Sequence, residues 1–291
     1  MQCSDADAVL TRGARDVHDD AMLSLAPRTL PELHRGFLDR AIEVLSADPR
    51  IVGVAAAGSY ADDRMDEYSD IDLVIAVAPD AHAAVLAERH RIAASIAPLV
   101  AAFTGEHVGE PRVLICLYHP PLLHVDLKFV ALADAALRVD DPVVLWERGA
   151  ALSEAMQQRQ AHYPAPDPQW IEDRFWVWVH YAAAKIGRGE LFEALDFLAF
   201  LRTRVLSPMA LVQLGLRPSG VRRIEHTAPQ LASRLAATVA AREPSDIRRA
   251  VHAAIAVYRE LRAQLTIELE LRSAAEAAAV EYLTMLRIAP E

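Results

Sequence analysis

The 291-residue sequence has few cysteines and no long apolar run. Its two cysteines, Cys3 and Cys116, are too few for a disulfide framework or, by themselves, for a structural zinc site. No stretch of about 18 apolar residues could span a membrane, and the N-terminus lacks a basic segment followed by an apolar one. We therefore expect a cytoplasmic protein in a reducing compartment, with no membrane partner.

The chain also lacks an excess of basic charge. It has 30 Lys and Arg residues against 40 Asp and Glu residues, which gives a net charge of −10. Proteins that bind nucleic acid usually neutralise phosphates with basic patches, so this balance argues against a nucleic-acid partner. It suits a cationic or neutral small molecule. Only two of the 30 basic residues are lysines, Lys128 and Lys185, and both lie close to the motifs described below.

The pattern of apolar residues changes near residue 150. Before it, short apolar segments bounded by Pro, Gly and Asp predict strands near 50–57, 70–78, 113–118, 122–130 and 143–146, with helices from 31 to 48 and over 81–102. After it, we find no strand pattern and predict helices over 168–187, 189–206, 228–241, 245–271 and 273–286, with a break at Pro208.

This pattern predicts an α+β protein with three parts. Residues 1–28 form an N-terminal arm, and residues 29–152 form a domain with a mixed β-sheet flanked by helices. Residues 153–291 form an all-helical bundle domain.

Two carboxylates lie on one face of the strand predicted at 70–78. Asp70 and Asp72 are two residues apart, so their side chains project from the same face, about 7 Å apart along the strand. A divalent cation would relieve their mutual repulsion, and a set of oxygen ligands favours Mg²⁺ or Mn²⁺ over zinc. Taken alone, the same Asp-x-Asp pattern also fits a solvated strand end.

Two further segments belong with this pair. Gly58-Ser59 ends the preceding strand, where the glycine permits a tight turn and the serine can cap a helix whose backbone N–H groups bind phosphate. The strand at 122–130 alternates and places His124, Asp126 and Lys128 on one face. Three carboxylates, a metal and a phosphate-binding turn are typical of a two-metal site for phosphoryl-type transfer.

These linked motifs resemble the DNA polymerase β-type nucleotidyltransferase superfamily. The shared pattern is Gly-Ser, ten further residues, Asp-Ile-Asp-Leu-Val-Ile and a later Asp on a strand, and it spans roughly residues 50–130. The resemblance implies that Asp70 and Asp72 hold both metal ions and that Asp126 ligates the catalytic one. It also implies that Ser59, next to Gly58, binds the phosphates of the nucleotide.

The helical half carries a second, shorter resemblance. The stretch from Tyr181 through Lys185 and Arg188 to Glu190 resembles the helical domain of aminoglycoside (streptomycin-type) adenylyltransferases. That resemblance implies a small polyhydroxylated amine as acceptor and a link to antibiotic resistance. A lysine ammonium suits a triphosphate, so we expect Lys185 to bind the nucleotide, with Arg188 as a further candidate one turn on. The alternative is an ordinary surface lysine.

Other residues of the helix at 168–187 leave two interpretations open. Glu172 and Asp173 are candidate general bases for an acceptor hydroxyl, although most helix carboxylates are only solvated. A stripe of residues three or four apart favours a place in the core over an aromatic wall for the acceptor; it consists of Trp170, Arg174, Trp178 and Tyr181.

Together these observations predict a metal-dependent nucleotidyltransferase. We expect it to move a nucleoside monophosphate, AMP from ATP by resemblance, to a hydroxyl of a small acceptor and to release pyrophosphate, with two Mg²⁺ ions or with Mn²⁺. Two alternatives remain open: the same chemistry on a protein or RNA acceptor, and a catalytically silent nucleotide-binding regulator. The sequence does not fix the oligomeric state.

Overall fold

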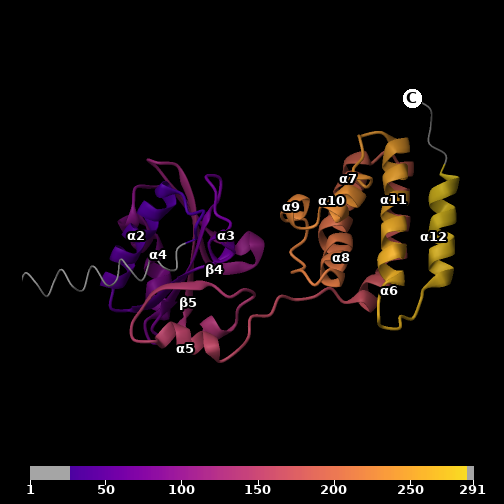
Figure 1. Cartoon of the computed structure of the whole chain (residues 1–291). Coiled ribbons are helices and arrows are strands. Elements are labelled where there is room, and N and C mark those ends of the chain that lie inside the picture. The colour runs from indigo at the N-terminus through magenta and orange to yellow at the C-terminus, as the bar shows by residue number, and fades with distance from the viewer. Residues whose placement is uncertain (1–26, 287–291) are drawn as a thin grey trace, which may run out of the picture. The chain divides into compact units, whose positions relative to one another are not determined.

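The computed structural model describes residues 27–286 and divides the chain into two compact units, Met1–His162 and Tyr163–Glu291 (Figure 1). The arm expected over 1–28 lies almost entirely outside the described residues. Within them, the first unit combines a β-sheet with helices and the second is helical, so the expected α+β class is confirmed. None of the helices described is long and apolar enough to cross a membrane.

The first unit is built on six strands. In chain order its elements are α2 (Glu32–Ala47), β1 (Ile51–Ala56), α3 (Gly58–Ala61), β2 (Ile71–Val77), α4 (His82–Ile96), β3 (Leu99–Gly105), η1 (Glu106–Val108), β4 (Glu110–Tyr118), β5 (Leu123–Ala131), η2 (Leu132–Ala136), β6 (Val143–Glu147) and α5 (Ala151–Gln157). The strands form one sheet in the order β3-β4-β5-β2-β1-β6. Only β2 and β5 pair in parallel and the other neighbours are antiparallel, so the sheet is mixed as predicted.

One face of the sheet is packed against α2 and α4. The odd-numbered residues of β2, such as Ile71 and Leu73, are buried there together with Leu38 of α2 and Ile92 of α4. This follows from the alternation of the strand, since successive side chains point to opposite faces.

Within the described part of the first unit, α5 covers one end of the opposite face. Ala76 of β2 and Val130 of β5 pack there against Leu152 of α5. A Cβ at Gly53 in β1 would lie 2.7 Å from Leu152 Cβ, so this glycine lets α5 approach the sheet closely. The even-numbered residues at the starts of β2 and β5 are less buried. Asp72 and Asp126 lie in this less covered region.

The helix predicted over 81–102 is wrong in its last part. It ends at Ile96 as α4, and residues from Leu99 onward form the edge strand β3, which pairs with β4. Pro98 explains the boundary, because proline has no backbone N–H and disfavours helical geometry in the residue before it. The Ala-rich composition of the segment hid this strand.

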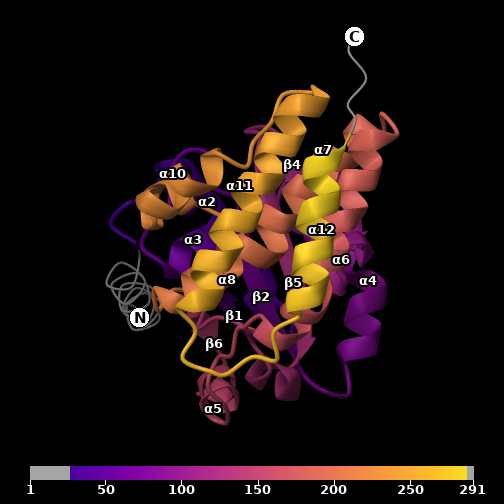
Figure 2. The same cartoon turned by 90° about the vertical axis from the view of Figure 1, so that its right-hand side faces the viewer.

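The second unit is helical throughout its described part. Its elements are α6 (Pro168–Gly187), α7 (Leu191–Phe200), the π-helical segment η3 (Leu201–Leu206), α8 (Ser207–Gln213), α9 (Ile224–Thr227), α10 (Pro229–Ala236), α11 (Pro244–Ala263) and α12 (Ser273–Met285). α6 packs against both α11 and α12 (Figure 2). The ring of Phe175 in α6 stacks on that of Tyr258 in α11 with centroids 3.8 Å apart, at the centre of the unit's core.

The predicted break at Pro208 is wrong. Helical structure runs without interruption from α7 through η3 into α8, and Pro208 lies inside it. In a regular α-helix a proline clashes with the carbonyl four residues earlier. The wider π-helical turn that directly precedes α8 changes this spacing, so the chain continues past the proline.

Candidate functional site

Asp72 of β2 and Asp126 of β5 are direct neighbours across the parallel strand pair. Residues in register on adjacent strands project from the same face, and the strands lie about 4.8 Å apart. Both side chains are partly exposed, on the face that α5 covers only at its other end. The structure therefore brings two of the three predicted carboxylates to one patch of the sheet.

The turn at Gly58 is built against Asp72. Gly58 has a φ of +56°, a conformation that side chains other than glycine rarely adopt, and a Cβ there would lie 2.2 Å from Asp72 Oδ2. The preceding residue, Ala57, donates its backbone N–H to the carbonyl oxygen of Asp72 at 2.9 Å. Ser59 follows in the short helix α3, so the Gly-Ser pair and the carboxylate lie together.

Replacing Gly58 by Ala should damage both the fold and the site. The positive φ costs about 1 to 2 kcal/mol for a residue with a Cβ, and the new methyl group would displace the Asp72 carboxylate. We expect turnover to fall about 100-fold, because a shift of about 1 Å in a reacting group has that effect. Gly109→Ala is the matched control, since Gly109 has a φ of +78° with no atom near its would-be Cβ. Equal turnover in the two variants, measured beside their urea unfolding curves, would contradict the assignment.

Asp70 lies directly before β2 and is partly exposed. Among residues 27–286, no group of three or more His, Cys, Asp or Glu side chains lies close enough together to hold a metal ion. Asp72 and Asp126 nevertheless suit Mg²⁺, which is commonly bound by one or two carboxylates together with waters and substrate phosphates. The close approach of the Asp72 carboxylate to Gly58, which only a residue without a Cβ permits, fits the same use because it brings backbone of the Gly-Ser turn next to that carboxylate.

Two basic residues share the face of Asp126. His124 Nε2 lies 3.1 Å from Asp126 Oδ1, and Lys128 Nζ lies 2.8 Å from Glu110 Oε2 at the start of β4. Glu110 also accepts from Arg112 at 2.6 Å. The Arg112 guanidinium, followed by the Lys128 ammonium, lowers the pKa of Glu110 to about 2. Lys128 is thus neutralised by a carboxylate beside the site.

The Glu110 pair predicts a pH-dependent part of stability. Because the pKa of Glu110 falls from 4.5 in the unfolded chain to about 2 in the folded one, its contribution is complete above about pH 4.5 and is lost as the pH falls toward 2. Glu110→Gln should lower the free energy of unfolding by about 1 to 2 kcal/mol at pH 7 and by much less at pH 3. Urea unfolding at both pH values checks this. Glu43→Gln, in an exposed pair, should show almost no change, and a pH-independent loss in Glu110→Gln would refute the interpretation.

Lys185 and Arg188 both contact carboxylates of the helical unit. Lys185 Nζ lies 2.5 Å from Glu190 Oε2 and 2.8 Å from Glu193 Oε2. Both contacts raise the pKa of Lys185, and the contact with Glu190 has the larger effect. Arg188 Nε lies 3.0 Å from Glu190 Oε1 and its side chain is largely exposed. Lys185 is therefore a fully charged ammonium that is already balanced by two acidic residues.

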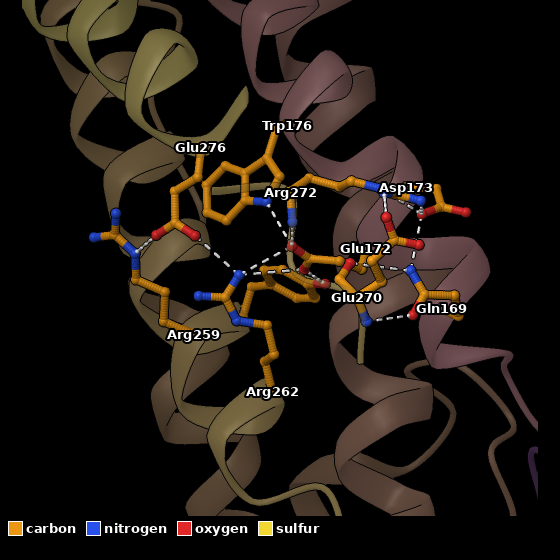
Figure 3. A network of polar contacts seen from close by, with 10 residues as sticks. Gln169, Glu172, Asp173, Trp176, Arg259, Arg262, Glu270, Arg272 and Glu276 are labelled. Atoms are coloured by element: carbon orange, nitrogen blue, oxygen red, sulfur yellow. Dashed lines mark hydrogen bonds and ion pairs between the residues drawn. The ribbon is translucent and has the colours of Figure 1, made fainter. Parts of the chain in front are cut away.

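Glu172 lies at the centre of a buried polar network (Figure 3). Its carboxylate accepts from Tyr258 Oη at 2.5 Å, from Trp176 Nε1 at 3.1 Å, from Arg262 at 3.1 Å and from the backbone N–H of Arg272 at 3.0 Å. Burial acts to raise the pKa of Glu172. The hydrogen bonds that its carboxylate accepts, of which the one from Tyr258 has the largest effect, together outweigh burial, so the pKa is lowered. A carboxylate with no exposed surface cannot reach an acceptor hydroxyl, so the geometry favours a structural role over that of general base.

Asp173 is the more exposed of the two candidate bases. Its Oδ1 accepts from Gln169 and from Arg272, each at 2.9 Å, in the outer part of the same network (Figure 3). Both contacts lower the pKa of Asp173, and the hydrogen bond from Gln169 has the larger effect, so Asp173 is ionised at neutral pH.

The aromatic stripe of α6 lies only partly in the core. Trp170 is 47% exposed and Tyr181 is 40% exposed, whereas Phe175 and Trp176 fill the interior. Trp170 also carries the guanidinium of Arg174 over its ring, 4.2 Å from the centroid. The expectation that the stripe belongs to the core is therefore wrong for Trp170 and Tyr181, whereas the partly buried Trp178 packs against the core.

Among the comparisons with known proteins, the match to a protein family lies in the first unit. Residues 38–102 match the family model of the nucleotidyltransferase domain. This segment runs from α2 into β3 and contains Gly58, Ser59, Asp70 and Asp72. The search of curated protein sequences gives no match.

Two solved structures align with most of the chain. An aminoglycoside 6-adenyltransferase from Bacillus subtilis has 13% sequence identity and a TM-score of 0.39, over 86% of this chain and 97% of the other. A nucleotidyltransferase-like protein from Exiguobacterium sibiricum 255-15 has 13% identity and a TM-score of 0.35, over 86% and 79%. The family match is the comparison that supports an assignment: residues 38–102, within the first unit, are similar to a nucleotidyltransferase domain.

Proposed function

We propose that the chain transfers a nucleoside monophosphate from a nucleoside triphosphate, ATP in the first instance, to a hydroxyl group of a small acceptor. The acceptor oxygen forms a bond to the α-phosphorus while the bond from that phosphorus to the oxygen bridging to the β-phosphate breaks. Pyrophosphate leaves, and the acceptor hydroxyl loses its proton. The observation that carries the proposal is that Asp126 lies directly beside Asp72, against which Gly58 packs. Gly58 and Asp72 both belong to the segment that matches a nucleotidyltransferase domain.

The carboxylates have distinct roles in this proposal. Asp70, Asp72 and Asp126 would hold divalent cations, two Mg²⁺ ions or Mn²⁺, which neutralise charge on the phosphates and lower the pKa of a bound hydroxyl. Asp126, on the neighbouring strand, would lie closest to the acceptor oxygen. The backbone at Gly58 and the hydroxyl of Ser59 would bind the triphosphate. Catalysis then consists mostly of orienting the two substrates and stabilising negative charge.

The helical unit would supply charge and a base. Lys185, with Arg188, would bind the triphosphate by exchanging a contact with Glu190 or Glu193 for phosphate oxygens. Asp173 is the remaining candidate general base, since Glu172 has no exposed surface. We therefore leave Glu172 out of the mechanism.

The acceptor we propose is an aminoglycoside-like antibiotic. The likeness of the stretch from Tyr181 to Glu190 to aminoglycoside adenylyltransferases supports this choice, and the net charge of −10 suits a polycationic substrate. Transfer of AMP to such a molecule would give antibiotic resistance to its host.

Pyrophosphate release tests the proposal. The protein is incubated with Mg²⁺, each nucleoside triphosphate and a panel of aminoglycosides, with Asp72→Asn as the blank and Asp80→Asn as the matched control. Release that needs one acceptor, is lost in Asp72→Asn and persists in Asp80→Asn supports the function. Mg²⁺-dependent ATP binding in calorimetry without release would instead favour a protein or RNA acceptor. If ATP does not bind at all, the proposed enzyme function is wrong.

A further inference from the structure

A buried histidine lies beside the carboxylate segment. His34 of α2 is 1% exposed, and its Nε2 lies 2.7 Å from the backbone carbonyl oxygen of Ser69. A carbonyl oxygen only accepts hydrogen bonds, so Nε2 carries the proton and donates it. This contact joins residues 35 positions apart in the sequence.

The second ring nitrogen of His34, Nδ1, makes a histidine an unfavourable choice for this buried position. His34 Nδ1 is buried and has no hydrogen-bond partner among the described residues. A buried polar atom without a partner is unfavourable, and an apolar side chain of similar size would avoid that cost. The contact made by Nε2 is therefore what distinguishes histidine from a leucine at this position.

The carbonyl that His34 holds belongs to a self-contained turn. Ser69 donates its backbone N–H to the Asp66 carbonyl at 3.1 Å, and its Oγ lies 3.0 Å from Asp66 Oδ1. The Asp66 backbone N–H donates to Ser69 Oγ at 3.0 Å. His34 thus ties an internally bonded turn to helix α2.

The next residue along the chain is Asp70. The carbonyl carbon of Ser69 is bonded to the backbone nitrogen of Asp70, so the contact with His34 is one peptide bond from this aspartate. Two residues later, the Asp72 carbonyl accepts from Ala57 at 2.9 Å. The backbone that carries both carboxylates is therefore fixed from α2 on one side and from the Gly58 turn on the other.

We propose that His34 is a positioning residue that fixes the backbone of Asp70 and Asp72 for metal binding by donating to Ser69. This inference rests on the proposed function, because it assumes that the two carboxylates bind the metal. Groups that orient metal ligands from behind typically change metal affinity or activity 10- to 100-fold when they are replaced.

The test uses three substitutions of this histidine. His34→Leu fills the volume without a donor, His34→Gln keeps an amide N–H at about the reach of Nε2, and His34→Asn carries an amide too short to reach Ser69. His82→Leu is the matched control, since His82 Nε2 also lies beside a carbonyl, that of Phe129, 3.3 Å away near the opposite end of β5. The measurements are Mn²⁺ affinity, kcat and KM for the nucleotide, thermal unfolding, and hydrogen exchange of the segment 66–72.

We expect His34→Leu to weaken Mn²⁺ binding about tenfold, to lower kcat 10- to 100-fold with little change in KM, and to speed exchange over 66–72. His34→Gln should restore most of each property, and His82→Leu should leave them near the wild-type values. If His34→Leu does not fold, the comparison of His34→Gln with His34→Asn decides the question in the same way. Mn²⁺ affinity and kcat within twofold of wild type in the donor-less variant, or no rescue by Gln, would overturn the proposal.

Failure of the proposed function would look different. In that case the wild-type protein itself would neither bind Mn²⁺ nor release pyrophosphate. Exchange over 66–72 would still report whether His34 holds the turn. Slower exchange in wild type and His34→Gln than in His34→Leu would then assign the histidine a structural role only, and the positioning of metal ligands would be rejected.

Discussion

Replacing Asp72 by Asn is expected to lower turnover about 10³-fold or more. The substitution keeps the size of the side chain next to Gly58 but removes the negative charge that would hold a divalent cation. A metal ion contributes several kcal/mol of charge stabilisation to such reactions, and each 1.36 kcal/mol corresponds to a factor of ten in rate. Initial rates of pyrophosphate release at saturating Mg²⁺ and ATP measure the effect.

Two further measurements separate loss of chemistry from loss of structure. The free energy of unfolding of Asp72→Asn without metal should stay within about 1 kcal/mol of wild type, because a partly exposed carboxylate next to Asp126 adds like-charge repulsion rather than core packing. Asp80→Asn removes the same charge beyond the other end of β2 and should change the rate less than twofold. Comparable rates in the Asp72 and Asp80 variants would disprove the site.

Replacing Glu172 by Ala is expected to destabilise the helical unit by about 3 to 5 kcal/mol. The change would leave Arg262 without its buried partner and would remove acceptors from Tyr258, Trp176 and the backbone N–H of Arg272 (Figure 3). Breaking a buried ion pair by removing one partner typically costs this much. A domain is stable by only about 5 to 15 kcal/mol, so the unit should approach unfolding.

Denaturant unfolding followed by tryptophan fluorescence measures this loss, since α6 contains three tryptophans, Trp170, Trp176 and Trp178. Glu276→Gln is the matched control: Glu276 also contacts Arg262, at 2.9 Å, but is partly exposed and should matter by about 1 kcal/mol. Because the pKa of Glu172 is lowered in the folded chain, the stability it contributes is present at neutral pH and is lost as the pH falls. If Glu172→Ala and Glu276→Gln lower the free energy of unfolding equally, the buried network does not stabilise the unit more than the partly exposed ion pair does.

The sequence predicts much of the first unit because its signals are local. The alternation around Asp70 and Asp72, the glycine turn at Gly58 and the alternating strand of Asp126 each occupy a few consecutive residues. Strand periodicity alone was enough to place Asp126 and Lys128 on one face, as the pairing of β5 bears out. The strand order of the sheet makes Asp72 and Asp126 direct neighbours, and no local sequence pattern encodes that order.

The features that were missed depend on partners far away in the chain. The burial of Glu172 is set by Tyr258 and Arg262, 86 and 90 residues further on, and no pattern on α6 marks them. The contact of His34 with Ser69 likewise becomes visible only once α2 packs beside the turn. The exposed side of α6 was misjudged for the same reason, since aromatic residues at helical spacing look alike whichever face is covered.

The parallel pairing of β2 with β5 also sets where this domain can change over evolutionary time. Residues 78–122 connect these two strands through α4 and the antiparallel pair β3–β4, so the turns between those elements can grow or shrink without disturbing the aspartates as long as β5 keeps its register with β2. One residue inserted within β5 ahead of Asp126 would instead turn that carboxylate into the interior beside α2 and α4, because a slip of one position swaps the two faces of a strand. Length differences among relatives should therefore gather around the bend at 105–110 and avoid 123–126.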